Sequence, residues 1–259
     1  TTMMIDVESG KLDIAIGTSE IDTSVAMDGG IDKVVGDVIK SNSVVLLNLS
    51  DESPKLQDKA VREAICLSVN TEEMTAASYG VLGITATSPY ATGLLGYESG
   101  HTYEYNPEKA RQILSDAGYK DGDIELFFLS ANTTELYAIA ETLQSYLSEI
   151  GINLTVESGS IATVNGIIRE DPLASDFIIN RQMDGIPDGE PWFSIYVYGD
   201  NYVFPQSARQ NDPELQEYLD VLEFSLDKDA RVQASKAVQA YLIDNYICIP
   251  ICEFGTGIA

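Results

Sequence analysis

Acidic side chains gather in the segment 181–193, RQMDGIPDGEPWF, and carboxylates are the groups with which this sequence could most readily do chemistry. A pair such as Asp184 and Asp188 would suit glycoside hydrolysis, in which two carboxyl groups lie about 5–9 Å apart. With Glu190 they could bind Ca²⁺, but their spacing differs from the D-x-D-x-D-G calcium loop. The chain carries 41 acids, so such groups arise by chance. We therefore expect neither a catalytic pair nor a metal site here.

Other signatures of catalysis are also weak. The single histidine, His101, lies in a glycine-flanked stretch, and no acid stands at a motif spacing from it. The sequence contains no G-x-S-x-G nucleophile motif, no H-E-x-x-H zinc motif and no phosphate-binding loop. These observations favour a protein that is not an enzyme, and we expect no cofactor.

The charge of the chain restricts its partners. Forty-one acids against fifteen bases give a net charge of −26, which repels phosphate backbones and anionic lipid. Nucleic-acid binding is therefore not expected. No apolar stretch approaches the roughly 20 residues that span a bilayer. The opening residues, TTMMID, have no basic region followed by a long apolar one, so we expect no signal peptide within the chain.

The three cysteines, Cys66, Cys248 and Cys252, form neither a disulfide framework nor a spaced zinc site. Cys248 and Cys252 flank Pro250 in a segment that reads as a strand. Four residues of strand separate their Cα atoms by about 13 Å, and a disulfide tolerates only about 7 Å. Unless the strand bends sharply at Pro250, these two thiols cannot pair. We expect all three cysteines to be small buried apolar side chains.

Helices and strands are predicted to alternate along the chain, which favours an α/β class. Asn106 as cap, Pro107 in the first turn and Gly118 as stop delimit one helix. Apolar spacing predicts further helices within 51–70, 136–150, 212–226 and 232–242, and strands at 124–129, 152–156, 176–180 and around 248–252. Residues 4–16 are expected to form a short helix and then a strand. Gly29-Gly30 is expected to break the helix or strand in which it lies.

Several segments resemble, in order and spacing, the dipeptide- and oligopeptide-binding proteins of ABC transporters. The segment 53–70, SPKLQDKAVREAICLSVN, is similar to the family's P-f-x-D-x-x-V-R-x-A stretch. Residues 103–119, YEYNPEKARQILSDAGY, match its Y-x-Y-(D/N)-P-x-K-A stretch almost position for position. Residues 141–156 and 7–15 resemble two further family segments. The resemblance covers nearly the whole chain.

The resemblance implies a binding protein whose two lobes close on a ligand at a hinge. Its fold would be a type II periplasmic-binding-protein-like α/β lobe, a mixed sheet flanked by helices. Family members are roughly twice as long, so residues 1–42 would be a remnant of the first lobe and hinge, and residues 43–259 the second, ligand-binding lobe. The partners it implies are a peptide ligand, an ABC permease in the membrane and the missing first lobe of the same protein.

The same resemblance assigns candidate ligand contacts. In the family, a loop of the form G-W-x-x-D-x-x-(D/E)-P-x-x-F holds the α-amino group of the peptide with its first Asp. In this chain Asp184 stands where the Trp is expected, and Pro187 stands where the Asp is expected. With a slip of one residue Asp188 would be the amine anchor. Otherwise Asp184 is the nearest candidate, or neither residue serves.

Nearby aromatic and amide side chains complete the candidate site. Trp192 would either wall a side-chain pocket or pack against the lobe, and Asn201 and Tyr202 would line the cleft. Arg62, in the family's R-x-A helix, is expected to form a structural ion pair rather than to contact ligand.

The altered loop leaves open a non-peptide ligand: a nickel complex, heme, a sugar or an opine. The implied location is extracytoplasmic, either in the periplasm or on the cell surface, with a lipid anchor upstream of this chain.

Overall fold

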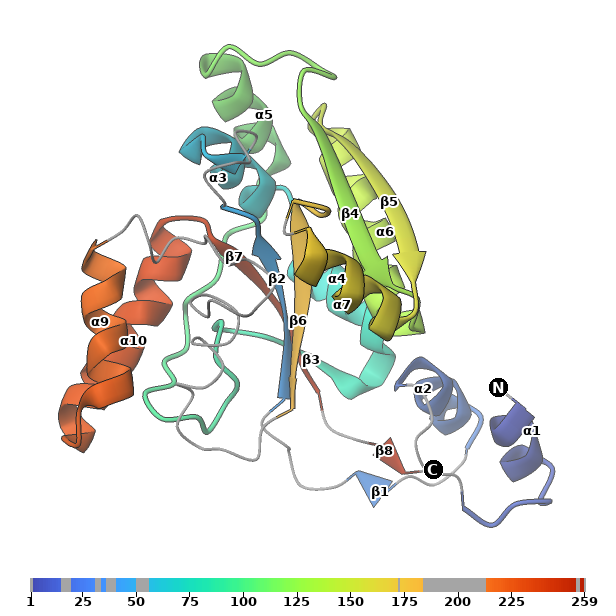
Figure 1. Cartoon of the computed structure of the whole chain (residues 1–259). Coiled ribbons are helices and arrows are strands. Elements are labelled where there is room, and N and C mark those ends of the chain that lie inside the picture. The colour runs from blue at the N-terminus through green and yellow to red at the C-terminus, as the bar shows by residue number, and fades with distance from the viewer. Residues whose placement is uncertain are drawn as a thin grey trace.

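The computed structural model describes residues 2–14, 20–30, 34–35, 41–49, 56–171, 173–183, 213–254 and 257–258 (Figure 1). Within these ranges, strands and helices alternate as expected for an α/β protein. No helix in the described ranges has the length and apolar character needed to cross a membrane.

A four-stranded antiparallel sheet in the order β3-β7-β2-β6 forms the centre of the molecule. Its strands are β2 (Ser41–Leu47), β3 (Gly83–Thr85), β6 (Phe177–Met183) and β7 (Cys248–Phe254). The central strands β2 and β7 are rich in β-branched and other apolar residues, and every residue of β7 is buried. The predicted strands at 176–180 and 248–252 are confirmed as β6 and β7.

Two shorter ladders accompany this sheet. Strands β4 (Glu125–Ala131) and β5 (Asn153–Gly159) pair in parallel and are joined by α6 (Thr134–Glu149), as the crossover between parallel strands requires. β1 (Val34–Val35) and β8 (Gly257–Ile258) pair antiparallel apart from the main sheet. In Figure 1 this pair lies near α2, at the end of the sheet where β2 begins.

The parallel pair is attached to the main sheet where β6 starts. The amide of Asp176 donates to the carbonyl of Phe127 at 2.8 Å, and the Asp176 carboxylate accepts from the Phe127 amide at 2.8 Å. The hydroxyl of Ser175 accepts from the amide of Leu129 at 3.0 Å. These bonds satisfy buried backbone groups at the junction and fix β6 beside the middle of β4.

Helices cover the sheets, and their ends are set by capping residues. The described helices are α1 (Thr2–Glu8), α2 (Glu20–Asp28), α3 (Lys59–Leu67), α4 (Thr71–Tyr79), α5 (Pro107–Asp116), α6, α7 (Ile161–Glu170), α9 (Pro213–Phe224) and α10 (Lys228–Asp244), and Gly80–Leu82 form a short 3₁₀ turn. The prediction for α5 is confirmed: Asn106 accepts from the amide of Lys109, and Gly118 follows with φ +91°.

Two regions differ from the predicted pattern. The helix expected within 51–70 spans only Lys59–Leu67, because Asp58 caps its start and Asn70 caps the separate helix α4. Near the amino terminus, residues 9–14 form no strand after α1, while residues 15 and 16 lie outside the described part. Gly29-Gly30 ends α2, as predicted.

The three cysteines are buried free thiols, which confirms the prediction for them. Strand β7 runs through Pro250, and its pairing with β2 shifts register at Ser43/Val44. Burial raises the pKa of the Cys66 and Cys248 thiols, so both remain protonated and unreactive at neutral pH.

Candidate functional site

The five residues predicted to contact ligand, Asp184, Asp188, Trp192, Asn201 and Tyr202, lie outside the described residues. Their outcome therefore stays a prediction. The structure does place the point where their segment begins. Strand β6 ends at Met183, which pairs with Ser41 at the start of β2. The side chains around this end of the sheet are accordingly the described part of the candidate site.

One face of the sheet end carries a cation on an aromatic platform. The guanidinium of Arg181 lies 4.3 Å from the ring centroid of Phe254 and 5.8 Å from that of Tyr79. These two rings stack on each other at 5.0 Å, and the Tyr79 hydroxyl is hydrogen-bonded to Ser43 of β2. Stacking on ring faces favours a guanidinium and holds it in one position. Arg181 was not singled out from the sequence.

The opposite face carries buried polar groups. Asn42 of β2 is completely buried and donates to the carbonyl of Pro89 at 2.7 Å. Its own Oδ1 atom has no hydrogen-bond partner in the part of the chain that the structure describes. On the neighbouring strand, the Glu253 carboxylate accepts from the amide and hydroxyl of Thr92 at 3.0 and 2.9 Å. Both contacts hold the segment 86–101, which we call the platform loop, against the sheet.

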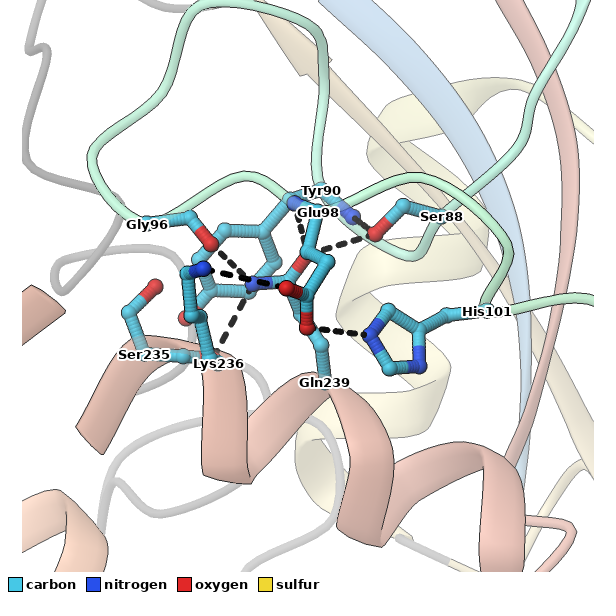
Figure 2. A network of polar contacts seen from close by, with 8 residues as sticks. All are labelled: Ser88, Tyr90, Gly96, Glu98, His101, Ser235, Lys236 and Gln239. Atoms are coloured by element: carbon cyan, nitrogen blue, oxygen red, sulfur yellow. Dashed lines mark hydrogen bonds and ion pairs between the residues drawn. The ribbon is translucent and has the colours of Figure 1, made fainter. Parts of the chain in front are cut away.

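Helix α10 holds the other side of the platform loop, mainly through Gln239 (Figure 2). The Gln239 carbonyl oxygen accepts from the Ser88 hydroxyl at 2.6 Å and from the Glu98 amide at 3.2 Å. Its amide group donates to the carbonyls of Gly96 and Ser235 at 2.8 and 3.0 Å. Gln239 is completely buried, so each of these bonds replaces hydration that the group has lost.

A surface ion-pair cluster closes the same network. The Glu98 carboxylate lies 3.0 Å from Lys236 Nζ and 3.3 Å from His101 Nε2 (Figure 2). The sequence-based view of His101 as a residue without an acid partner is therefore wrong: the partner stands three residues before it. Hydrogen bonds from Lys236 and His101 lower the pKa of the Glu98 carboxyl.

This lowered pKa makes the cluster sensitive to acid. The folded pKa lies below the unfolded one, so the cluster stabilises the fold above the ordinary carboxyl pKa of about 4.3. The contribution is lost as the pH falls through the lowered pKa. We expect Glu98→Gln to lower the melting temperature at pH 7 by a few degrees, and this deficit to be smaller at pH 3.

Melting curves at both pH values check this expectation, with Glu104→Gln as control. Glu104 is an exposed acid only six residues away in sequence. A deficit for Glu98→Gln that is equal at both pH values would contradict the assignment.

Arg62 has a structural role, as predicted, but its partners are carbonyls rather than a single acid. Its side chain donates to the carbonyls of Leu56, Gln57 and Asn245 at 2.9, 2.9 and 3.1 Å. Burial lowers the pKa of Arg62. These bonds join the residues before α3 to the end of α10.

Taken together, the described side chains around the sheet end hold and orient one another. Among the described residues, no group of three or more His, Cys, Asp or Glu side chains could hold a metal ion. This end of the sheet carries the Arg181 guanidinium stacked on aromatic rings and the buried amide oxygen of Asn42. It also carries the platform loop, which is hydrogen-bonded to both β7 and α10. Such rigidly held polar groups suit selective binding.

Comparison with known proteins identifies relatives over most of the chain. Residues 1–204 match the family model described as bacterial extracellular solute-binding proteins, family 5 Middle. A putative ABC transporter peptide-binding protein of Brucella ovis is 26% identical over 165 residues, which cover 62% of this chain and 31% of the relative. Heme-binding protein A of Haemophilus influenzae is 23% identical over 219 residues, which cover 83% of this chain and 40% of the relative.

Solved structures share the fold. A dipeptide-binding protein from Pseudoalteromonas sp. SM9913, solved in complex with Met-Leu, superimposes with a TM-score of 0.81 at 20% identity, covering 99% of this chain and 51% of that one. The chain thus spans about a third of the first curated relatives and about half of this structure. The predicted fold class and resemblance are both confirmed. The chain belongs to family 5 of the bacterial extracellular solute-binding proteins.

Proposed function

We propose that this chain is part of the substrate-binding component of an ABC importer, which captures peptides outside the membrane and delivers them to the permease. The observation that carries this proposal is the family match over residues 1–204. The names of two relatives support it, one a putative ABC transporter peptide-binding protein and one a dipeptide-binding protein with bound Met-Leu. The protein's task would be binding without chemical conversion of the ligand.

We also propose that residues 1–42 belong to the first lobe and hinge and that residues 43–259 form the second lobe. The β1–β8 ladder supports this division. β1 precedes β2 and β8 follows β7, and β2 and β7 are neighbours in the main sheet. The chain therefore enters and leaves the second lobe side by side, as a hinge between two lobes requires. The remainder of the first lobe would supply the opposite wall of the cleft.

The ligand would be held at the sheet end from which the segment after Met183 departs. Asp188 is our first candidate for the partner of the peptide's α-ammonium group, and Asp184 is the second. A carboxylate fixed in a closing, partly dry cleft forms a strong charge-assisted hydrogen bond to an ammonium group. Trp192, Asn201 and Tyr202 would line the same cleft. Arg181, seated on Phe254, adds a positive charge to the described part of this site.

A non-peptide ligand is the second candidate function. Asp184 and Pro187 occupy the positions at which the peptide-binding pattern has Trp and Asp, so the usual amine anchor is altered. One relative is named as a heme-binding protein. The alternative ligands remain a nickel complex, heme, a sugar or an opine.

Thermal-shift screening of the full-length protein against peptides, sugars, heme and metal chelates tests both candidates. A ligand at 100 times its dissociation constant stabilises the folded state by about 2.7 kcal/mol, which gives a shift of several degrees. We expect peptides with a free amino terminus to give this shift. Asp188→Asn should strongly reduce this peptide-induced shift while changing the melting temperature of the ligand-free protein little.

Asp220→Asn is the matched control, because Asp220 lies on the exposed face of α9 and also loses one charge. Shifts only with non-peptide compounds would overturn the peptide assignment in favour of the alternative. Peptide shifts that persist in both Asp188→Asn and Asp184→Asn would reject these anchors while leaving peptide binding in place.

A further inference from the structure

A cavity of about 300 Å³ lies between helix α7, the carboxyl half of β4 and strand β6. Its walls are mainly aliphatic and come from four separate elements. β4 contributes Leu129 and Ala131, the first turn of α6 contributes Leu136, α7 contributes Ile161 and Ile168, and β6 contributes Ile178. In Figure 1 the ends of β4 and β6 point toward the same side of the molecule. Ligands of α/β proteins commonly bind outside the carboxyl ends of strands.

The size of this cavity is suited to a small ligand. An apolar cavity of about 150 Å³ already accommodates benzene, and small-molecule pockets begin at about 300 Å³. The space under α7 is therefore large enough for one ring-bearing group with room for its attachment.

Helix α7 buries few residues against the rest of the protein, which would allow a ring-bearing group to enter the cavity. Only Val164 and Ile168 of this helix are buried, whereas Ile161 and Ile167 are 51% and 41% exposed. By comparison, α6 buries seven residues on the other side of the β4–β5 pair. Since few apolar contacts hold α7, a small outward movement of this helix costs little.

One polar atom in the wall lacks a partner. Thr133 Oγ1 is buried and forms no hydrogen bond with any residue in the described ranges. The neighbouring hydroxyl of Ser130 is satisfied, since it donates to the carbonyls of Ala131 and Leu136, both at 3.2 Å. A buried hydroxyl without a partner is costly, and a ligand group that bonds to it would recover that cost.

We propose that this cavity binds an aromatic ring with one hydrogen-bonding group, and that its occupant is the tyrosine or tryptophan side chain of a captured peptide. The ring would lie among the aliphatic walls, and its hydroxyl or indole N–H would pair with Thr133 Oγ1. Such side chains combine an apolar body with a polar tip, as the cavity does. The peptide part of this inference rests on the proposed function.

The cavity is tested first without a peptide, on the full chain, with p-cresol and toluene as probes. Both carry the same methylated ring, and only p-cresol has the hydroxyl. We expect p-cresol to bind about 2- to 10-fold more tightly, the effect of one net hydrogen bond. Methyl NMR signals of Ile161 and Ile168 should shift on titration. Those of Ile84, which is exposed on β3, should not.

Two variants test the aliphatic lining and the Thr133 hydroxyl separately. Thr133→Val keeps the shape and removes the hydroxyl, so p-cresol and toluene should then bind equally. Ala131→Leu fills the cavity, so both probes should be lost, while retained circular dichroism shows that the fold persists. Absence of Ile161 and Ile168 shifts with either probe, or an unchanged preference for p-cresol in Thr133→Val, would overturn the proposal.

The peptide step is then measured by calorimetry on the full-length protein with Ala-Tyr-Ala, Ala-Phe-Ala and Ala-Ala-Ala. We expect the tyrosine peptide to bind most tightly and to lose its advantage over Ala-Phe-Ala in Thr133→Val. Probe binding without binding of any peptide would reject the proposed peptide function and the tyrosine occupant, while leaving the aromatic cavity itself supported. Peptide binding with no aromatic preference would reject the inference and leave the proposed function standing.

Discussion

Replacing Arg62 by methionine is expected to lower the free energy of unfolding by about 3 kcal/mol. Arg62 is only 9% exposed, and its three hydrogen bonds satisfy carbonyls of Leu56, Gln57 and Asn245. Methionine fills much of the same space but leaves these carbonyls without their donor. For a chain of this size the loss corresponds to a melting temperature lower by roughly 6–12 °C.

Urea unfolding and calorimetry of Arg62→Met measure this loss, with Arg111→Met as the matched control. Arg111 also donates to a carbonyl, that of Glu149 at 2.8 Å, but its side chain is 47% exposed. Water replaces the lost donor there, so we expect a change of less than about 1 kcal/mol. Similar losses for the two variants would show that Arg62 does not bridge α3 and α10 as described.

Replacing Gly96 by alanine is expected to be similarly damaging, at about 3 kcal/mol, and to loosen the platform loop from α10. Gly96 has φ +73°, a conformation that L-residues rarely adopt. A Cβ atom there would lie 2.6 Å from Cβ of Ser235 and 3.0 Å from the carbonyl of Val232. The loop cannot then approach the helix closely enough for the bond between Gln239 and the Gly96 carbonyl.

Gly100→Ala is the control, because it measures the cost of the left-handed backbone conformation without a steric clash. Gly100 has a similar φ of +94°, but a Cβ atom there meets nothing within 4 Å. We expect this variant to lose only about 1 kcal/mol, the cost of the left-handed conformation. Equal melting temperatures for the two variants would mean that the contact with Ser235 is unimportant.

The parts of the fold that were predictable are those determined by nearby residues. Helix α5 was delimited correctly because its cap, its first-turn proline and its terminal glycine all lie within 13 positions, from Asn106 to Gly118. Strand β2 was not predicted, since its partners β6 and β7 lie far along the chain. The Arg62 prediction missed the Asn245 carbonyl for the same reason, because Asn245 is 183 positions away.

For the candidate site, the sequence contains a signal of buried polar contacts. Ser235, Val238, Gln239 and Leu242 share the buried face of α10, and a glutamine among such positions indicates a buried polar contact. Glu253 in the fully buried strand β7 gives the same indication. Arg181 carried no comparable signal, since a cation next to a predicted loop is ordinarily exposed.

The anchoring of the platform loop has a consequence for how it opens. The amides of Thr92 and Glu98 donate to side chains from β7 and α10, not to neighbouring backbone. Each proton can therefore exchange with deuterium only when the loop detaches from the element to which that amide is bonded. Because Gln239 alone supplies three bonds to the loop, the loop should detach as one cooperative unit, and exchange at Thr92 and Glu98 should proceed at matching rates.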